Sequence, residues 1–168
     1  MLHIGDVGGI DLSSSVWLQL APFVVITMDA EQTARDLSEK GFLDLVPQIP
    51  QDEVVYLHSW GVAAAMEDMS AKFPKLRALH SGSIPLPAVF PESNPDGNGG
   101  IPTSLQHIRL EAPVVDGGGW RPLTTFLARR VFSGNRIDSS TLDRSPRMHL
   151  EAEEDIRSMV GKFRITHA

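Results

Sequence analysis

Short apolar segments with a common internal spacing recur along the chain. In the clearest one, Leu105-Gln-His-Ile-Arg-Leu110, apolar residues occupy the first, fourth and sixth positions and polar residues lie between them. In a β-strand, Ile108 and Leu110 point to one side and the alternating polar residues point to the other. Because a single strand cannot bury its apolar side alone, this pattern predicts neighbouring strands of the same kind.

Four further segments share this spacing, although three of them carry a polar residue in one apolar position. They are residues 23–28, 52–57, 76–81 and 137–142, and Leu2-His-Ile4 has the form of the end of another. Measured between fourth positions, the segments are 24, 29, 24, 29 and 32 residues apart. The Leu-x-x-Leu-x-Leu pattern resembles the leucine-rich repeat, in which one coil takes about 20–29 residues.

This resemblance implies an α/β fold of a particular kind. We expect a leucine-rich-repeat-like solenoid, with a curved parallel sheet in sequence order and with helices and loops on its outer face. Residues 1–168 would form a single domain of this type. The alternative is a set of unrelated amphipathic strands in an ordinary α/β domain.

Between the strands, apolar residues spaced by three and four predict helices. The clearest predicted helix covers residues 62–73, and others are predicted at 16–20, 120–130 and 150–163. Leu123, Phe126, Leu127 and Val131 form the expected buried stripe of the third. Residues 84–102, rich in Pro, Gly and Asn, are predicted to form a long loop with little helix.

Composition limits the classes of function. The chain has 168 residues, of which 42% are hydrophobic and 21% charged, as in globular domains. A net charge of −6 and a pI of about 5.4 argue against nucleic-acid or anionic-membrane partners. No apolar run is long enough for a spanning helix and no secretory signal is visible, so we expect a cytoplasmic or nuclear protein.

A longer stretch resembles a known family. Trp120-Arg-Pro-Leu-Thr-Thr-Phe-Leu-Ala-Arg-Arg matches W-x-x-L-x-x-F-L-x-x-R, and Gly134 and a short strand follow. This looks like the last repeat of fungal, basidiomycete-type F-box proteins with leucine-rich repeats. Phe73-Pro-Lys-Leu-Arg-Ala-Leu79 is similar to the F-P-x-L-x-x-L that opens their repeats.

The family implies a role as the substrate receptor of a cullin-type ubiquitin ligase. Its F-box, an N-terminal helical segment that docks a Skp-type adaptor, has no match in this sequence. The first predicted strand begins at Met1 without the capping element of a solenoid, so we interpret the chain as a fragment or a shortened product of a longer protein; the alternative is a frayed chain end. A Skp-type adaptor is a partner only if an F-box lies upstream. By itself the chain would be a non-catalytic protein-interaction module that binds a protein substrate or partner.

In such an array, the outward-pointing positions of successive strands line up on the concave face. The predicted partner-binding residues on this face are Tyr56, His58, His80, His107, Arg109 and Glu111. The same positions continue to Thr141 and Asp143 in the next strand. His58 and His80 are expected to lie diagonally on neighbouring strands, with Tyr56 beside His80. Because Tyr and Arg are favoured anchors of protein interfaces, this surface predicts protein binding.

Motifs for other chemistry are not found. The sequence has no cysteine, no H-E-x-x-H, no G-x-S-x-G and no G-x-x-x-x-G-K-[ST], so we predict no catalytic residue, no metal site and no cofactor. The alternative function is a small α/β enzyme or ligand-binding domain that lacks a recognisable catalytic motif. That alternative predicts helices on both faces of the sheet and a deep pocket.

Overall fold

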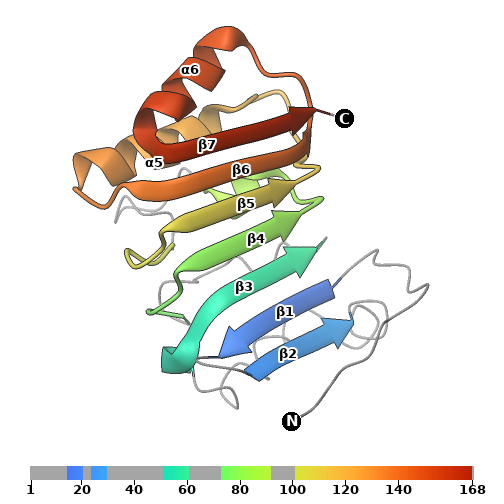
Figure 1. Cartoon of the computed structure of the whole chain (residues 1–168). Coiled ribbons are helices and arrows are strands. Elements are labelled where there is room, and N and C mark those ends of the chain that lie inside the picture. The colour runs from blue at the N-terminus through green and yellow to red at the C-terminus, as the bar shows by residue number, and fades with distance from the viewer. Residues whose placement is uncertain (1–14, 21–23, 30–50, 61–72, 92–100, 168) are drawn as a thin grey trace.

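The computed structural model describes residues 15–20, 24–29, 51–60, 73–91 and 101–167. Within these ranges, seven strands form one sheet in the order β2-β1-β3-β4-β5-β6-β7 (Figure 1). None of the described helices is long and apolar enough to cross a membrane.

Five of the strands are parallel and lie in sequence order. They are β3 (Val54–Trp60), β4 (Ala78–Gly82), β5 (His107–Glu111), β6 (Ile137–Ser145) and β7 (Val160–His167). A 3₁₀ turn, Gln51–Glu53, precedes β3. This confirms the predicted α/β class and the parallel sheet in sequence order from β3 onward. The sheet is not curled, so the predicted curvature is wrong (Figure 1).

The N-terminal strands depart from the predicted order. Strand β2 (Val24–Asp29) matches the predicted segment 23–28, but it pairs antiparallel with β1 (Ser15–Leu20). Strand β1 lies between β2 and β3 and is antiparallel to both. The predicted helix over residues 16–20 is therefore wrong. An apolar run this short fits a strand as well as a helix, and pairing on both edges decides for the strand.

The three apolar positions of the recurring segment form three rows across the parallel sheet. In the fourth- and sixth-position rows each strand contributes one residue, in register. The first-position residues lie at the start of a strand or two residues before it. The first row is Val54, Leu76, Leu105, Ile137 and Val160, all buried. The fourth-position row is Leu57, Leu79, Ile108, Ser140 and Phe163. In the sixth-position row, Ser81, Leu110 and Leu142 are buried and Ile165 packs against the core.

These rows correct two details of the predicted pattern. Leu57, not Val55, is the register partner of Leu79, so the segment 52–57 was aligned two residues out of place. Because side chains alternate with period two, the shift keeps every residue on its predicted face. The second correction concerns Val160-Gly-Lys-Phe-Arg-Ile165, which has the full apolar spacing. It belongs to strand β7, although a helix is predicted through residue 163.

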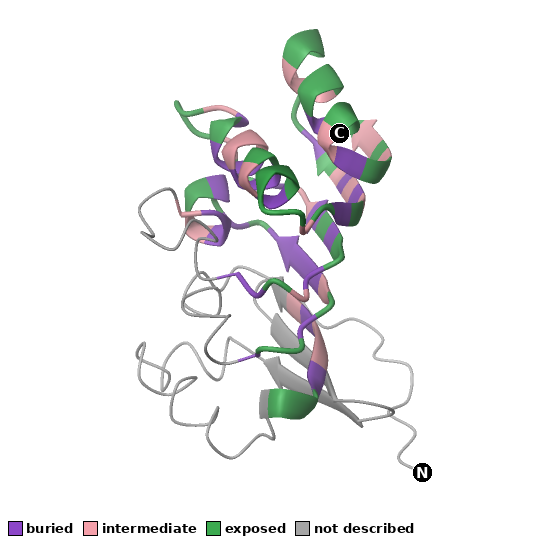
Figure 2. Ribbon diagram, turned by 90° about the vertical axis from the view of Figure 1, so that its left-hand side faces the viewer, coloured by how far each residue is buried: buried purple, intermediate pink, exposed green. Residues whose placement is uncertain are grey.

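Within the described residues, three helices accompany the parallel strands. Helix α4 (Leu86–Val89) and helix α5 (Arg121–Phe132) lie on one side of the sheet (Figure 2). Helix α6 (Leu150–Met159) packs beside β7 and α5, with Ile156 buried. The predicted helix 150–163 thus ends earlier, at Met159. The predicted helix 62–73 lies outside the described residues except for Phe73, which is buried in a turn.

Helix α5 confirms three of the four residues of its predicted buried stripe, and Arg130 is buried in place of the fourth, Val131. Leu123, Phe126 and Leu127 are buried, but Val131 is 44% exposed and Arg130 is only 1% exposed. The guanidinium of Arg130 reaches the turn before β5. There it donates hydrogen bonds to the carbonyl oxygens of Pro102 (3.1 Å), Thr103 (2.8 Å) and Leu105 (2.7 Å). The buried cation is therefore surrounded by carbonyl acceptors.

Polar side chains satisfy backbone carbonyls at two other strand-entry turns. The hydroxyl of Ser104 bonds the carbonyl oxygens of Pro74 (2.8 Å) and Leu76 (2.7 Å), in the turn before β4. Arg136 donates to those of Ser158, Met159 and Val160, at the entry to β7, over 2.7–3.2 Å. Buried carbonyls without partners are costly, so these side chains join successive segments of the chain.

Strand exits also share one backbone conformation. Ser83, Ala112 and Arg144 each follow the aligned part of their strand at the same register position. Their φ angles are 52°, 45° and 49°, and they are the non-glycine residues with positive φ in the described chain. Ser83 N–H donates to the carbonyl oxygen of Glu111, and Ala112 N–H donates to that of Asp143. The recurrence found in the strands therefore extends into the turns.

Candidate functional site: the polar face of the parallel sheet

The side of the parallel sheet opposite α4 and α5 carries polar side chains. We call it the polar face. Figure 2 shows α4 and α5 on the other side of the strands. The residues of the polar face are Tyr56, His58, His80, His107, Arg109, Glu111, Ser139, Thr141, Asp143, Lys162, Arg164 and Thr166. It therefore holds all six predicted binding residues.

Two histidines occupy the β3–β4 part of the polar face. His58 and His80 are register partners, and their rings stack with centroids 4.1 Å apart and planes 8° from parallel. The predicted diagonal placement is therefore wrong, because of the two-residue register error in β3. Tyr56 is the diagonal neighbour instead. Because the two histidines are register partners on neighbouring strands, their rings are separated by about one strand spacing, a distance at which aromatic rings stack.

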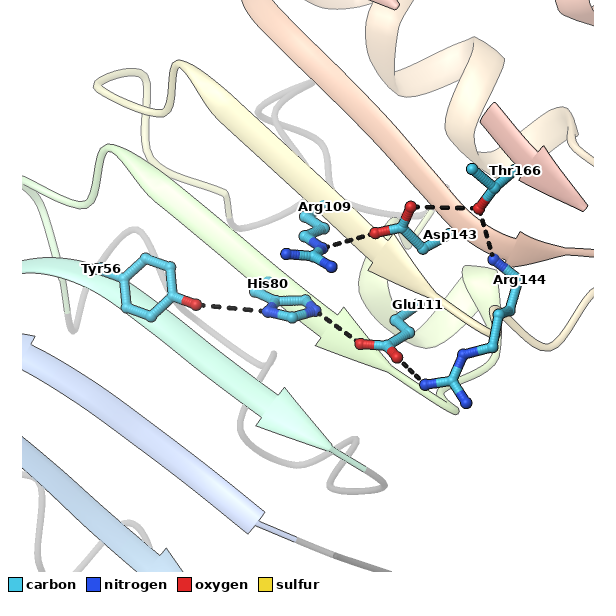
Figure 3. Close-up of polar contacts among 7 residues, drawn as sticks. All are labelled: Tyr56, His80, Arg109, Glu111, Asp143, Arg144 and Thr166. Carbon is cyan, nitrogen blue, oxygen red and sulfur yellow. Dashed lines mark hydrogen bonds and ion pairs between the residues drawn. The ribbon is translucent and has the colours of Figure 1, made fainter. Parts of the chain in front are cut away.

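Of the two stacked histidines, His80 also contacts Tyr56 on β3 and Glu111 on β5. Its Nδ1 lies 3.4 Å from the hydroxyl of Tyr56, and its Nε2 lies 3.3 Å from a carboxylate oxygen of Glu111 (Figure 3). His80 Nε2 forms no hydrogen bond with a described residue, so its contact with Glu111 is a close approach only, and the Nδ1 contact with the Tyr56 hydroxyl is compatible with either tautomer. The other oxygen of Glu111 is paired with Arg144.

Both histidines are neutral at physiological pH. Burial first, then the charges of His80 and Arg109, lower the pKa of His58 to about 4. Burial and then Arg109 lower the pKa of His80 to about 4, against a smaller opposing effect of Asp143. Burial also raises the pKa of Tyr56. The β3–β4 part of the face is therefore an uncharged aromatic surface with hydrogen-bonding edges.

A second polar chain crosses β5, β6 and β7. Arg109 Nε donates to a carboxylate oxygen of Asp143 at 2.8 Å, and the other oxygen lies 3.3 Å from the hydroxyl of Thr166. The same hydroxyl accepts the backbone N–H of Arg144 at 3.2 Å (Figure 3). Asp143 and Glu111 are thus each held by an arginine, and their orientations are fixed from two sides.

A serine and a histidine meet at the start of β5 and β6. His107 Nδ1 lies 2.9 Å from Ser139 Oγ, and His107 is exposed while Ser139 is half-buried. A hydroxyl beside an imidazole is the minimal arrangement for a nucleophile with its base. Among the described residues, no carboxylate contacts His107 to orient it, so the arrangement lacks the third member of a triad.

Some members of the polar face escaped the sequence analysis. Lys162, Arg164 and Thr166 were missed because no strand was predicted after residue 142, and the first residues of β7 were assigned to the predicted helix 150–163. The signal was present, since the segment beginning at Val160 has the same apolar spacing as the other strands. Arg144 was missed because the predicted strand ends at Leu142, whereas β6 continues to Ser145 and the Arg144 guanidinium pairs with Glu111.

Other classes of site find little support in the described part of the chain. No group of three or more His, Cys, Asp or Glu residues there is arranged to hold a metal ion. Comparisons with protein-family models, curated proteins and solved structures gave no match to this chain. The arguments for function therefore come from the geometry of the polar face.

Proposed function

We propose that the chain is a non-catalytic protein-interaction module that binds a partner protein through the polar face. One observation carries the proposal. An uncharged aromatic cluster on β3–β4 lies beside charged residues on β5–β7, some of them hydrogen-bonded and some of them exposed, while α4 and α5 lie on the other side of the sheet. Protein interfaces typically combine a core enriched in aromatic residues with a polar, charged rim, and the polar face has both kinds of surface.

The in-register rows support a leucine-rich-repeat-like solenoid as the scaffold for this module. Four consecutive coils place equivalent residues 22, 29, 32 and 23 positions apart at Leu57, Leu79, Ile108, Ser140 and Phe163. The strand-exit turns repeat as well. On this scaffold the polar face corresponds to the substrate-recognition surface of an F-box receptor of a ubiquitin ligase. This is the role that the Trp120 and Phe73 motifs suggested.

Site-specific cross-linking tests the proposal. A photoreactive amino acid is placed at Arg109 or Thr141 on the polar face, and at Ala128, an exposed position of α5, as the control. Irradiation in cells that naturally express the chain is expected to attach a defined protein at positions 109 and 141 but not at 128. The attached protein is then identified by mass spectrometry and produced for direct binding measurements.

Variants connect that partner to the face. The triple variant Tyr56→Ala, His80→Ala, Arg109→Ala is expected to weaken binding of the purified partner at least tenfold, while its circular dichroism spectrum stays that of the wild type. Since His80 is buried, Arg109→Ala alone provides a second reading with little effect on folding. Equal cross-linking at position 128, or undiminished binding by the folded variants, rejects the polar face as the binding surface.

The alternative, a small α/β enzyme, has the contact between Ser139 and His107 in its favour. It takes second place because His107 is exposed to water and lacks an orienting carboxylate among the described residues. A fluorophosphonate probe, which labels activated serines, distinguishes the two. We expect no labelling above that of a Ser139→Ala variant. Labelling of the wild type that is lost in Ser139→Ala would establish catalysis instead.

A further inference from the structure

The β5–β7 end of the polar face has an ordered arrangement of cations around two hydroxyls. Ser139 and Thr141 lie on the central strand β6. Their register partners on β5 are His107 and Arg109, and those on β7 are Lys162 and Arg164. The four outer residues are exposed and the two hydroxyl residues are half-buried. We call these six residues the basic end of the polar face.

The charges at the basic end are not balanced by the described residues around it. Arg109 pairs with Asp143, and Arg144 pairs with Glu111, so the two carboxylates of this region are already matched. Lys162 and Arg164 have no ion pair with any described residue. The local charge is therefore about +2, in a chain whose net charge is −6. A positive region on an acidic protein favours a negatively charged ligand by direct complementarity.

Strand geometry sets the spacing that such a ligand must match. Lys162 and Arg164 are two residues apart on one strand, which places their Cα atoms about 6.6 Å from each other. Arg109 and Arg164 are two strands apart, about 9.6 Å. An extended peptide presents alternate side chains on one side at the same interval of about 6.6 Å, so acidic residues at alternate positions match Lys162 and Arg164. The hydroxyls of Ser139 and Thr141 lie between the cations, where they can bond to peptide groups.

We propose that the basic end binds an extended acidic segment of the partner protein, with carboxylates at alternate positions on Lys162 and Arg164. This inference rests on the proposed function and specifies the chemistry of the partner. A second copy of the chain fits poorly, because the same cations would face one another. Nucleic acid also fits poorly, since two unmatched cations release few counterions and the rest of the chain is acidic.

Peptide binding to the full chain tests the inference. The probe is a fluorescein-labelled decapeptide of alternating Glu and Ser, and the matched probe replaces every Glu with Gln. We expect the Glu peptide to bind in a fluorescence anisotropy assay and the Gln peptide to bind at least tenfold more weakly. Binding of the Glu peptide is expected to weaken several-fold when the salt concentration is raised from low to physiological ionic strength.

Charge reversal locates the binding. Lys162→Glu with Arg164→Glu is expected to weaken the Glu peptide at least tenfold. Lys75→Glu with Arg77→Glu makes the same change of net charge at exposed positions before β4, so it is the matched control and is expected to have less than a threefold effect. A thermal melt shows whether the charge-reversed variant destabilises β7. If it does, Lys162→Gln with Arg164→Gln removes the two charges with less disturbance of the strand and replaces it in the assay.

Several results would overturn the inference. These are no binding of the Glu peptide, equal binding of the Gln peptide, an equal loss in the Lys75 and Arg77 control, or preferential binding of a single-stranded oligonucleotide of equal charge. If cross-linking at positions 109 and 141 still attaches a partner in that case, the protein-binding role stands and only its acidic specificity is lost. If cross-linking fails as well, both are rejected.

Discussion

The two sides of the parallel sheet are stabilised by different kinds of interaction. On the covered side, apolar rows pack against the helices, and polar side chains such as Arg130 and Ser104 satisfy backbone carbonyls of a neighbouring segment. On the polar face, side chains contact side chains of the adjacent strands. The covered side therefore holds the coils together, whereas the polar face can change its chemistry with a smaller effect on folding.

The largest expected effect follows from placing a charge on the covered side. Leu110 is 1% exposed, so Leu110→Asp buries an unpaired carboxylate and is expected to reduce the free energy of unfolding by more than about 4 kcal/mol. The adjacent change Arg109→Asn, on the polar face, removes one exposed ion pair and is expected to cost less than about 1 kcal/mol. Urea denaturation measures both, and equal losses would contradict the assignment of the two sides.

Removing the buried guanidinium is expected to have the next largest effect. Arg130→Met keeps an unbranched side chain but removes three hydrogen bonds to backbone carbonyls, two of them buried, at a cost of about 3 kcal/mol. Arg147→Met, at an exposed position, is expected to change stability by less than about 0.5 kcal/mol. If the two variants unfold at the same urea concentration, the capping of the turn before β5 does not stabilise the fold.

A close backbone approach between β6 and β7 gives a smaller effect. A Cβ atom at Gly161 would lie 2.6 Å from the carbonyl oxygen of Asp138, so Gly161→Ala must separate the two strands locally and is expected to cost about 2 kcal/mol. At Gly117 a Cβ would meet nothing within 4 Å, which makes Gly117→Ala the matched control. The melting temperature reports both, and unchanged melting of Gly161→Ala would contradict the observed pairing.

The smallest expected effect tests the polar face through pH. The pKa values of His58 and His80 are about 4 in the folded chain and about 6.5 in the unfolded chain. The unfolded chain therefore binds more protons between these values, so the two histidines reduce stability as the pH falls from about 6.5 toward 4. Allowing for their partial exposure, the pair is expected to contribute about 1 kcal/mol over this range.

The measurement compares the wild type with His58→Gln, His80→Gln. The free energy of unfolding is obtained by urea denaturation at neutral pH and at about pH 5, and the difference between the two values is expected to be smaller for the variant. The neighbouring charged and titratable groups Tyr56, Arg109, Glu111 and Asp143 remain in both proteins. An equal difference would show that the stacked pair does not carry this part of the pH dependence.

Local spacing was sufficient to predict four of the five parallel strands, β3 to β6, and the side of the sheet on which their residues lie. The segments beginning at Leu76, Leu105 and Ile137 were aligned correctly, because each begins with a buried apolar residue that another buried residue follows three positions later. All six predicted binding residues lie on the polar face. Alternation with period two explains this success, since even the misaligned segment 52–57 kept Tyr56 and His58 on the correct side.

The features that were missed depend on partners distant in sequence. Nothing within residues 15–20 indicates that β1 inserts between β2 and β3, because strand order is decided by pairing across the sheet. The burial of Arg130 depends on three carbonyls more than 20 residues away, whereas its own neighbours in sequence suggested an exposed helix end. Stacking of the two histidines required the register of β3, which apolar spacing fixed only to within two residues.

The shared geometry of the strand exits has a consequence for how this architecture tolerates change. Three chemically unlike residues, Ser83, Ala112 and Arg144, adopt the same left-handed backbone. The conformation must then be imposed by the main chain, since a serine, an alanine and an arginine have no side-chain preference in common. Because the side chain does not set this geometry, we expect these three positions to accept other residues at a similar cost in backbone strain, and the loops that follow them to tolerate changes of length.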